Sequence, residues 1–166
     1  MKALLYAGLA LLTLWLQITV VPSLAVWGVR PNLVLVTLLA VALRWRDTFV
    51  FAYAALLGVA LDSFTHGVLG AYGLSFFAAA LAARLAGGAM YEDNLLLGAV
   101  AVFGLCLLEG AVFAGVFRVL DRQIPWWNWI FTRVLPGSLY NALLAPLVLM
   151  GLMRLERWLA VQAREY

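Results

Sequence analysis

Long apolar runs separated by short charged breaks make up almost the whole chain. The three longest runs are Ala3–Val26, Leu95–Phe117 and Val134–Met153. Each has about 20 residues or more, which at roughly 1.5 Å per residue lets a helix cross a hydrocarbon core of roughly 30 Å. Val68–Ala83 is a fourth, slightly shorter run. The pattern predicts an all-α protein, a polytopic membrane helix bundle, because hydrocarbon accepts only helices without unpaired backbone groups.

Two further runs, Pro31–Leu43 and Phe49–Leu61, have only about 13 residues each, which is short for a full span. A flanking arginine such as Arg30 can extend its charged head to the headgroup region and so lengthen the usable helix. The alternative is that residues 31–61 form a helical hairpin that does not cross fully. Proline is favourable in a first helical turn, so we expect the second helix to start at Arg30 or Pro31. About six transmembrane helices are predicted.

The distribution of basic residues predicts the orientation of the bundle. If six helices cross and the N-terminus is cytoplasmic, seven basic residues lie inside and four lie outside. The inside set is Lys2, Arg44, Arg46, Arg84, Arg154, Arg157 and Arg164, and the outside set is Arg30, Arg118, Arg122 and Arg133. The positive-inside rule favours this arrangement, with both termini cytoplasmic. The N-terminal run is longer than the roughly 7–15 apolar residues of a signal peptide, so we expect a retained first span.

Composition excludes several other classes of protein. Hydrophobic residues make up 66% of the chain, charged residues 11%, and the mean hydropathy is +1.01, so a soluble domain would lack polar surface. We expect residues 1–166 to form a single integral membrane domain. The net charge of +3 is small and scattered, which does not indicate nucleic-acid binding. The one cysteine, Cys106, and the one histidine, His66, occur without a CxxC or HExxH motif, so we predict no metal site, no cofactor and no enzymatic activity.

The stretch that starts at Gly58 is rich in glycine and contains Asp62. Small residues let neighbouring helices approach closely, so we expect the third and fourth helices to meet around Gly58 and Gly70. Asp62 is expected to close the third helix, followed by a loop from Ser63 to Gly67. Two interpretations of Asp62 are open: a polar turn at the membrane surface, or a residue that organises helix packing or a polar site.

Polar side chains also occur inside the apolar runs. Glu109 lies nine residues before Arg118, or roughly 13 Å below the outer surface at 1.5 Å per residue. Asn141 and Gln17 fall at a similar depth in the last and first runs. Because unpaired polar groups are unfavourable in hydrocarbon, we expect Glu109 to face the bundle with Asn141 as its neighbour. A role in packing alone and a functional role for Glu109 are both open.

The longest loop expected outside, from Arg118 to Arg133, contains Trp126, Trp127 and Trp129. Tryptophan is enriched at membrane–water interfaces, so a segment lying in the membrane plane explains this cluster. Aromatic residues also dominate binding hot spots, so docking of a partner is the alternative.

Several motifs together resemble the MreD family, small integral membrane proteins of the bacterial rod-shape elongation machinery. The resemblance covers nearly the whole chain, apart from the Trp-rich loop, which is not a family feature. The motifs are Arg30-Pro31-Asn32-Leu33, Gly58-x-x-x-Asp62, Leu69-Gly70, Pro136, Asn141-Ala142-x-x-Ala145-Pro146 and Arg154-Leu155-Glu156-Arg157.

The resemblance implies a bundle similar to the substrate-binding S components of ECF-type vitamin transporters, in the bacterial cytoplasmic (inner) membrane. It implies a non-enzymatic scaffold that binds MreC and, through MreC, is linked to MreB, RodA and the transpeptidase paired with RodA. Such a scaffold would support peptidoglycan synthesis and cell shape, in contact with membrane lipid. The alternative is a substrate-binding subunit of a vitamin-type transporter. The candidate structural or partner-binding residues are Gly58, Asp62, Gly70, Glu109, Trp126, Trp127, Trp129, Pro136, Asn141 and Pro146.

Overall fold

The structure is a computed structural model that describes residues 2–44, 48–65, 68–86, 94–120 and 125–162. The main elements of these ranges are the helices α1 (Lys2–Thr19), α2 (Leu33–Arg44), α3 (Phe49–Thr65), α4 (Ala71–Leu85), α5 (Leu95–Val119) and α7 (Leu135–Gln162). Three short elements complete them: the 3-10 turn η1 (Val21–Leu24), the single turn α6 (Trp126–Trp129) and the π-helical turn η3 (Ile130–Val134). The described ranges contain no β-strand. The expected all-α bundle with six main helices is confirmed.

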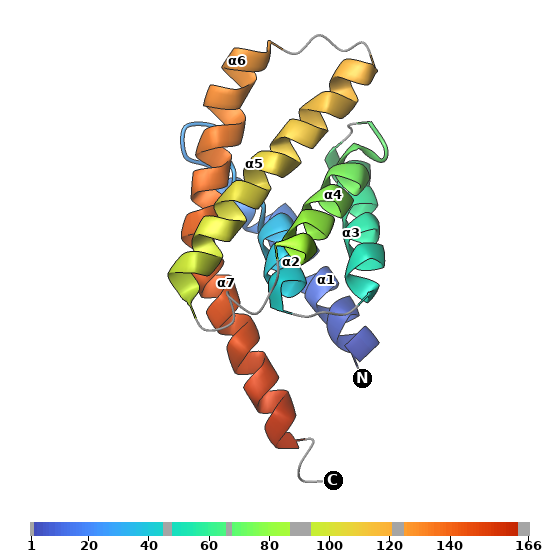
Figure 1. Ribbon diagram of the computed structural model, residues 1–166, viewed down its shortest axis with the longest axis vertical. Coiled ribbons are helices and arrows are strands. Elements are labelled where there is room, and N and C mark those ends of the chain that lie inside the picture. The colour runs from blue at the N-terminus through green and yellow to red at the C-terminus, as the bar shows by residue number, and fades with distance from the viewer. Residues whose placement is uncertain (1, 45–47, 66–67, 87–93, 121–124, 163–166) are drawn as a thin grey trace.

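The helices α3, α4, α5 and α7 run in alternating directions along the bundle (Figure 1). The start of α1 and the end of α7 lie toward the same end, the lower one in Figure 1. At the opposite end, α6 and η3 continue directly into α7, so that one helical rod extends from Trp127 to Trp158.

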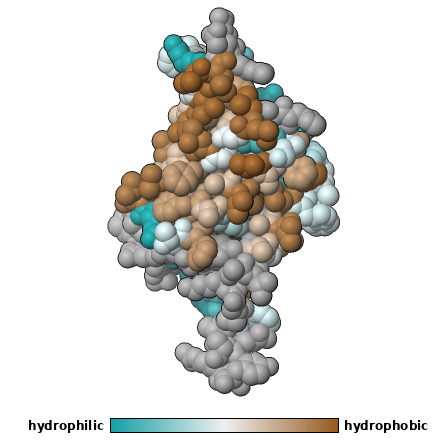
Figure 2. All heavy atoms as spheres, turned by 90° about the vertical axis from the view of Figure 1, so that its right-hand side faces the viewer, coloured by the Kyte–Doolittle hydropathy of each residue, from teal (hydrophilic) through white to brown (hydrophobic). Residues whose placement is uncertain are grey.

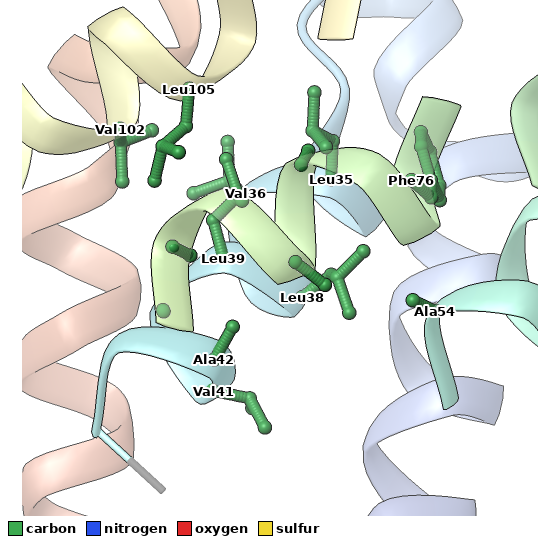
Figure 3. Close-up of a cluster of buried hydrophobic side chains, with 14 of the residues drawn as sticks. Leu35, Val36, Leu38, Leu39, Val41, Ala42, Ala54, Phe76, Val102 and Leu105 are labelled. Atoms are coloured by element: carbon green, nitrogen blue, oxygen red, sulfur yellow. The ribbon is translucent and has the colours of Figure 1, made fainter. Parts of the chain in front are cut away.

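The short helix α2 lies at the centre of this arrangement. Every residue from Val34 to Leu43 is buried, and α2 packs against α1, α3, α4, α5 and α7. Figure 3 shows the side chains of α2 among those of its neighbours, including Ala54 of α3, Phe76 of α4, and Val102 and Leu105 of α5. A helix that is apolar on all sides can be buried on all sides. The central helix is thus neither of the two, among the described residues, that are long and apolar enough to cross a membrane.

Apolar side chains dominate the outside of the bundle as well. Large exposed apolar side chains occur on each of the six main helices except α2, for example Leu11, Leu56, Leu85, Leu96 and Leu143. Figure 2 shows hydrophobic residues over much of the described part of the face that carries α3 and α4. The buried polar side chains of the described ranges are Thr13, Thr37, Asp62, Ser75, Glu109, Ser138 and Asn141. Polar groups inside and apolar groups outside are the distribution that a lipid environment requires.

Helix lengths qualify the predicted spans. Only α5 and the rod from Trp127 to Trp158 are long and apolar enough, among the described residues, to cross a membrane by themselves. The 12 residues of α2 extend about 18 Å at 1.5 Å per residue, which is shorter than a core of roughly 30 Å. Since other helices enclose α2, its backbone ends are shielded from lipid by protein.

Two helix boundaries differ from the sequence-based expectation. The first helix ends at Thr19, well before Val26, because the chain passes into the 3-10 turn that contains Pro22, and proline interrupts a helix. The second helix begins at Leu33 rather than at Arg30 or Pro31. The reason is that the side chain of Asn32 caps it.

Candidate functional site

The first turn of α2 is held by side chains from both ends of the chain. The backbone N–H of Asn32 donates to Oδ1 of Asn141 in α7 at 2.7 Å. The N–H of Leu33 donates to Oε1 of Gln17 in α1 at 2.8 Å. Asn32 caps the helix, since its Oδ1 accepts from the N–H of Leu35 at 3.0 Å. The first N–H groups of a helix have no partner within it, so these acceptors satisfy donors that hydrocarbon could not.

Pro31 fits this arrangement because it brings no N–H group of its own. It is fully buried, and its carbonyl oxygen accepts from Nε2 of Gln17 at 3.2 Å. Gln17 therefore uses both ends of its amide on the chain that enters α2. The motif from Arg30 to Leu33 and the distant Asn141 form one hydrogen-bonded unit, which we call the α2 clamp: Gln17, Pro31, Asn32, Leu33 and Asn141.

Glu109 of α5 is buried, as expected, with 9% of its surface exposed. Its Oε1 accepts from the hydroxyl of Ser75 in α4 at 3.3 Å. Asn141 instead directs its amide nitrogen to Sγ of Cys106 at 3.5 Å and its oxygen to the α2 clamp. Glu109 and Asn141, expected as neighbours, therefore form hydrogen bonds with different partners. Sequence reasoning missed Ser75, although it is a polar residue inside an apolar run.

Asp62 joins the end of α3 to the start of α4. Only 2% of its surface is exposed, and its carboxylate accepts from three backbone N–H groups: Gly70 at 2.8 Å, Tyr72 at 3.1 Å and Gly73 at 3.4 Å. A carboxylate at a helix N-terminus satisfies free donors and interacts favourably with the helix dipole.

The end of α3 differs from the sequence-based expectation. Asp62 does not close α3, because the helix continues to Thr65, and Ser63 and Thr65 donate their hydroxyls to carbonyls one turn earlier. His66 and Gly67 lie outside the described residues. Asp62 therefore lies inside the last turn of α3, and its carboxylate lies beside the first N–H groups of α4.

The close contact between α3 and α4 is made by Gly58 and Gly73. A Cβ atom added to Gly58 would lie 2.5 Å from Cα of Gly73, which is backbone and has no room to move. The sequence-based expectation named Gly70 as the second contact, and that is wrong, since Gly70 has nothing within 4 Å of its Cβ position. Gly70 has φ of +93°, a left-handed conformation that glycine adopts without strain. Its role is to turn the chain into α4.

A cavity of about 150 Å³ lies next to the buried polar residues. Its lining includes Arg30, Asn32, Tyr72, Glu109, Arg133 and Asn141. Glu109 and Asn141 therefore face the same space even though they bond to different partners. Gln17 does not belong to this lining and bonds to Pro31 and Leu33 from the side of α1.

The segment of tryptophans is helical and not a loop, which corrects the sequence-based expectation. Trp126 begins α6, which leads through η3 into α7. The ring of Trp129 stacks on Phe113 of α5, with centroids 6.0 Å apart. Trp127 is 77% exposed and stacks on Phe131 of the next turn. Trp127 and Trp129 of this segment thus have different environments: Trp129 packs against α5, and Trp127 is directed outward.

The prolines of the last helix have distinct local effects. Pro136 follows the π-helical turn, in which the N–H of Leu135 donates to the carbonyl of Ile130. A proline ring clashes with the carbonyl four residues earlier and offers it no N–H, so a wider turn at this point relieves the conflict. Pro146 lies inside α7 and is half-buried. Neighbouring helices allow such a proline to be tolerated in a membrane helix.

The other end of α2 is also tied to α7. Nη2 of Arg44 lies 2.7 Å from Oε2 of Glu156, and Nε of the same arginine donates to Oε1 at 3.2 Å. This two-point geometry is the strong form of an arginine–carboxylate pair. It involves the glutamate of the motif from Arg154 to Arg157, so two of the sequence motifs contact α2 at opposite ends.

The chemistry of these residues is mainly structural. The polar groups of the α2 clamp and of Asp62 are directed at backbone N–H and C=O groups and fix helix ends. In the described part of the chain, no three His, Cys, Asp or Glu side chains gather as a metal site would require.

Comparison with known proteins gives one clear match. The family model described as rod shape-determining protein MreD matches residues 1–157. No curated protein and no solved structure matches the chain, so the expected similarity to S components of ECF transporters stays a prediction. The matched region contains the α2 clamp, Asp62, the contact of Gly58 with Gly73, and the pair of Arg44 with Glu156. The chain belongs to the MreD family of rod shape-determining proteins.

Proposed function

We propose that this protein is a non-enzymatic scaffold of the rod-shape complex that binds MreC within the cytoplasmic membrane. MreB, RodA and the transpeptidase paired with RodA are linked to it through that complex. Membership of the family supports a role in rod-shape determination, and the family is not known for enzymatic activity. The finer statements, including support of peptidoglycan synthesis, rest on the resemblance of the sequence.

The observation that carries this proposal is the contrast between the inside and the outside of the bundle. The buried side chains of Asp62 and Asn141 hold helix ends in place, whereas apolar side chains on α1, α5 and α7 are exposed. A scaffold for membrane proteins needs a rigid interior and apolar helix faces on which other helices can pack. We place the principal MreC contact on these faces.

The exposed side chain of Trp127 gives a sharp test of the contact with MreC. If Trp127 is a binding hot spot, Trp127→Ala should weaken co-purification of MreC by tenfold or more. We expect co-purification of MreC to be retained in Trp127→Ala, because the indole anchors the start of the helix in the headgroup region. The second variant is Leu143→Gln, at an exposed position midway along α7. It should weaken MreC binding if helix faces carry the contact. Loss of MreC with Trp127→Ala and retention with Leu143→Gln would reverse this assignment.

Depletion in a rod-shaped cell separates the scaffold from the transporter alternative. Under the proposal, depleted cells become round, and a vitamin supplied outside is still taken up. Loss of uptake of a vitamin with a normal cell shape would favour the substrate-binding subunit. The cavity beside Glu109 is the feature that keeps this alternative in view.

A further inference from the structure

A second, larger cavity adjoins the one beside Glu109. Its volume is about 770 Å³, and α1, η1, the connection from Gly28 to Asn32, and the end of α3 form its walls. The two cavities share four lining residues: Arg30, Asn32, Tyr72 and Arg133. These residues therefore stand where the two spaces meet.

Positive charge gathers at this junction. Arg30 and Arg133 come from segments far apart in the sequence, and both line both cavities. Among the described residues that line the larger cavity there is no carboxylate. The smaller cavity does have a carboxylate in its lining, that of Glu109, which accepts a hydrogen bond from Ser75. Asp62 lines neither cavity and accepts from the backbone of α4. Two guanidinium groups over a cavity without a carboxylate favour an anionic ligand.

The backbone fixes the position of Arg133 on one side of this junction. The π-helical turn that precedes Pro136 contains Arg133, and such turns are frequent at functional sites. Nη1 of Arg133 donates to the carbonyl of Gly28 at 3.4 Å. The guanidinium is thereby held against the connection between α1 and α2.

That connection is itself a tight turn. Val26 and Val29 exchange two backbone hydrogen bonds of 3.0 and 2.9 Å. Trp27 and Gly28 between them have φ of +50° and +78°, as in a two-residue hairpin turn with positive φ at both positions. The wall of the cavity that precedes Arg30 is therefore a hydrogen-bonded turn rather than a loose loop.

Away from the two arginines, the larger cavity is lined by the polar side chains of Gln17 and Thr65 and by a group of apolar side chains. Ile18 of α1 and Phe64 of α3 line it and are exposed at 44% and 57%. Val21 and Leu61 line it and are buried. An anion site next to an apolar wall, on a bundle with an apolar exterior, fits a molecule with a charged head and a hydrocarbon chain.

We propose that the joined cavities bind an amphiphile with a phosphate headgroup. The guanidinium groups of Arg30 and Arg133 bind the phosphate oxygens, and Ile18 and Phe64 contact the hydrocarbon chain. A phosphate offers the paired oxygens that an arginine fork binds at two points. This site is separate from the scaffold role, and its test needs no partner protein.

Binding is measured on the purified full-length protein in nanodiscs of phosphatidylcholine to which fluorescent phosphatidic acid is added. Wild-type protein should bind this probe saturably. Arg30→Gln and Arg133→Gln should each lower the affinity about tenfold or more, and the double variant should abolish saturable binding. Arg133→Lys should also lose affinity, because it keeps the charge but not the fork. Retention of a single thermal transition shows that each variant is folded.

The matched control for net charge is Arg118→Gln, at the exposed end of α5 outside both linings. We expect it to change the affinity less than threefold. An equal loss with Arg118→Gln would overturn the site, because general attraction to a basic surface would then explain the binding. Wild-type affinity in the double variant would overturn it as well.

Competition identifies the source of the phosphate. Glycerol 3-phosphate has the same headgroup as phosphatidic acid without its chains, and we expect it to compete at least a hundredfold more weakly. Phe64→Ser should reduce the affinity for phosphatidic acid and leave that for glycerol 3-phosphate unchanged. Equal competition by the two molecules would overturn the assignment to an amphiphile and point to a soluble phosphate.

Discussion

Oδ1 of Asn141 accepts a hydrogen bond of 2.7 Å from the backbone N–H of Asn32, a residue 109 positions earlier in the chain. This bond joins the last helix to the first turn of the buried helix α2. Gln17 makes the corresponding bond from the first helix, at 2.8 Å to the N–H of Leu33. Because Val34 to Leu43 of α2 are buried, these side chains replace the solvent that would satisfy a helix end elsewhere.

Removal of the acceptor at position 141 should destabilise the protein. Asn141→Leu leaves the buried N–H of Asn32 without a partner, and the free energy of unfolding should fall by about 1–3 kcal/mol. Reversible unfolding in mixed detergent micelles measures the change. Asn128→Leu, an exposed position of α6, is the control and should change stability by less than about 0.5 kcal/mol. Equal stability of Asn141→Leu and wild type would contradict the α2 clamp.

The contact between α3 and α4 should be intolerant of a single methyl group. Gly58→Ala places a Cβ 2.5 Å from the backbone of Gly73, and overpacking of this kind destabilises by about 1–3 kcal/mol. The control is Gly104→Ala in α5, where nothing lies within 4 Å of the added atom. Alanine should be neutral or stabilising there, since glycine is the weaker helix former. The measurement is the yield and thermal transition of folded protein, and the same result for both variants would argue against close packing.

Ser75 and Glu109 should be energetically coupled. The variants Ser75→Ala and Glu109→Leu each remove one partner of the same hydrogen bond, so their effects on unfolding should deviate from additivity by about 0.5 kcal/mol or more. Glu109→Leu combined with Asn141→Leu should deviate less, because these residues bond to different partners. A larger coupling for the second pair would restore the pairing expected from the sequence.

The topology can be tested with single cysteines at exposed, described positions. After replacement of the buried Cys106, cysteines at Asn128 and Arg157 should react with a membrane-impermeant reagent from opposite sides of the membrane. The reason is that these residues lie near the two ends of the helical rod from Trp127 to Trp158. With the positive-inside orientation, position 157 is cytoplasmic. Labelling of both positions from the same side would exclude a crossing by this rod.

The sequence predicts the helices well because hydrophobicity along a membrane chain is a local signal. The sequence predicts the six main helices, the burial of Glu109 and the close approach of two helices at Gly58. The partners of the polar groups cannot be predicted in the same way, because they depend on how helices rotate against one another. Depth alone suggested Glu109 with Asn141, but the rotation of α4 brings Ser75 to Glu109, and Asn141 meets the start of α2. The start of α2 at Leu33 depends on the cap by Asn32. The sequence could not exclude an earlier start, because proline is also favourable in a first helical turn.

The burial of Val34 to Leu43 in α2 has a consequence for the order in which the chain can be assembled. Its two ends are secured by Asn141 and Glu156 of α7, and these residues leave the ribosome about a hundred positions after α2 has been made. A helix of 12 residues is too short to settle in a bilayer unaided, where a span needs about 20. We therefore expect α2 to lack its contacts with Asn141 and Glu156 until the last helix has been inserted. The centre of the bundle can therefore reach its native structure only after α7 has been synthesised.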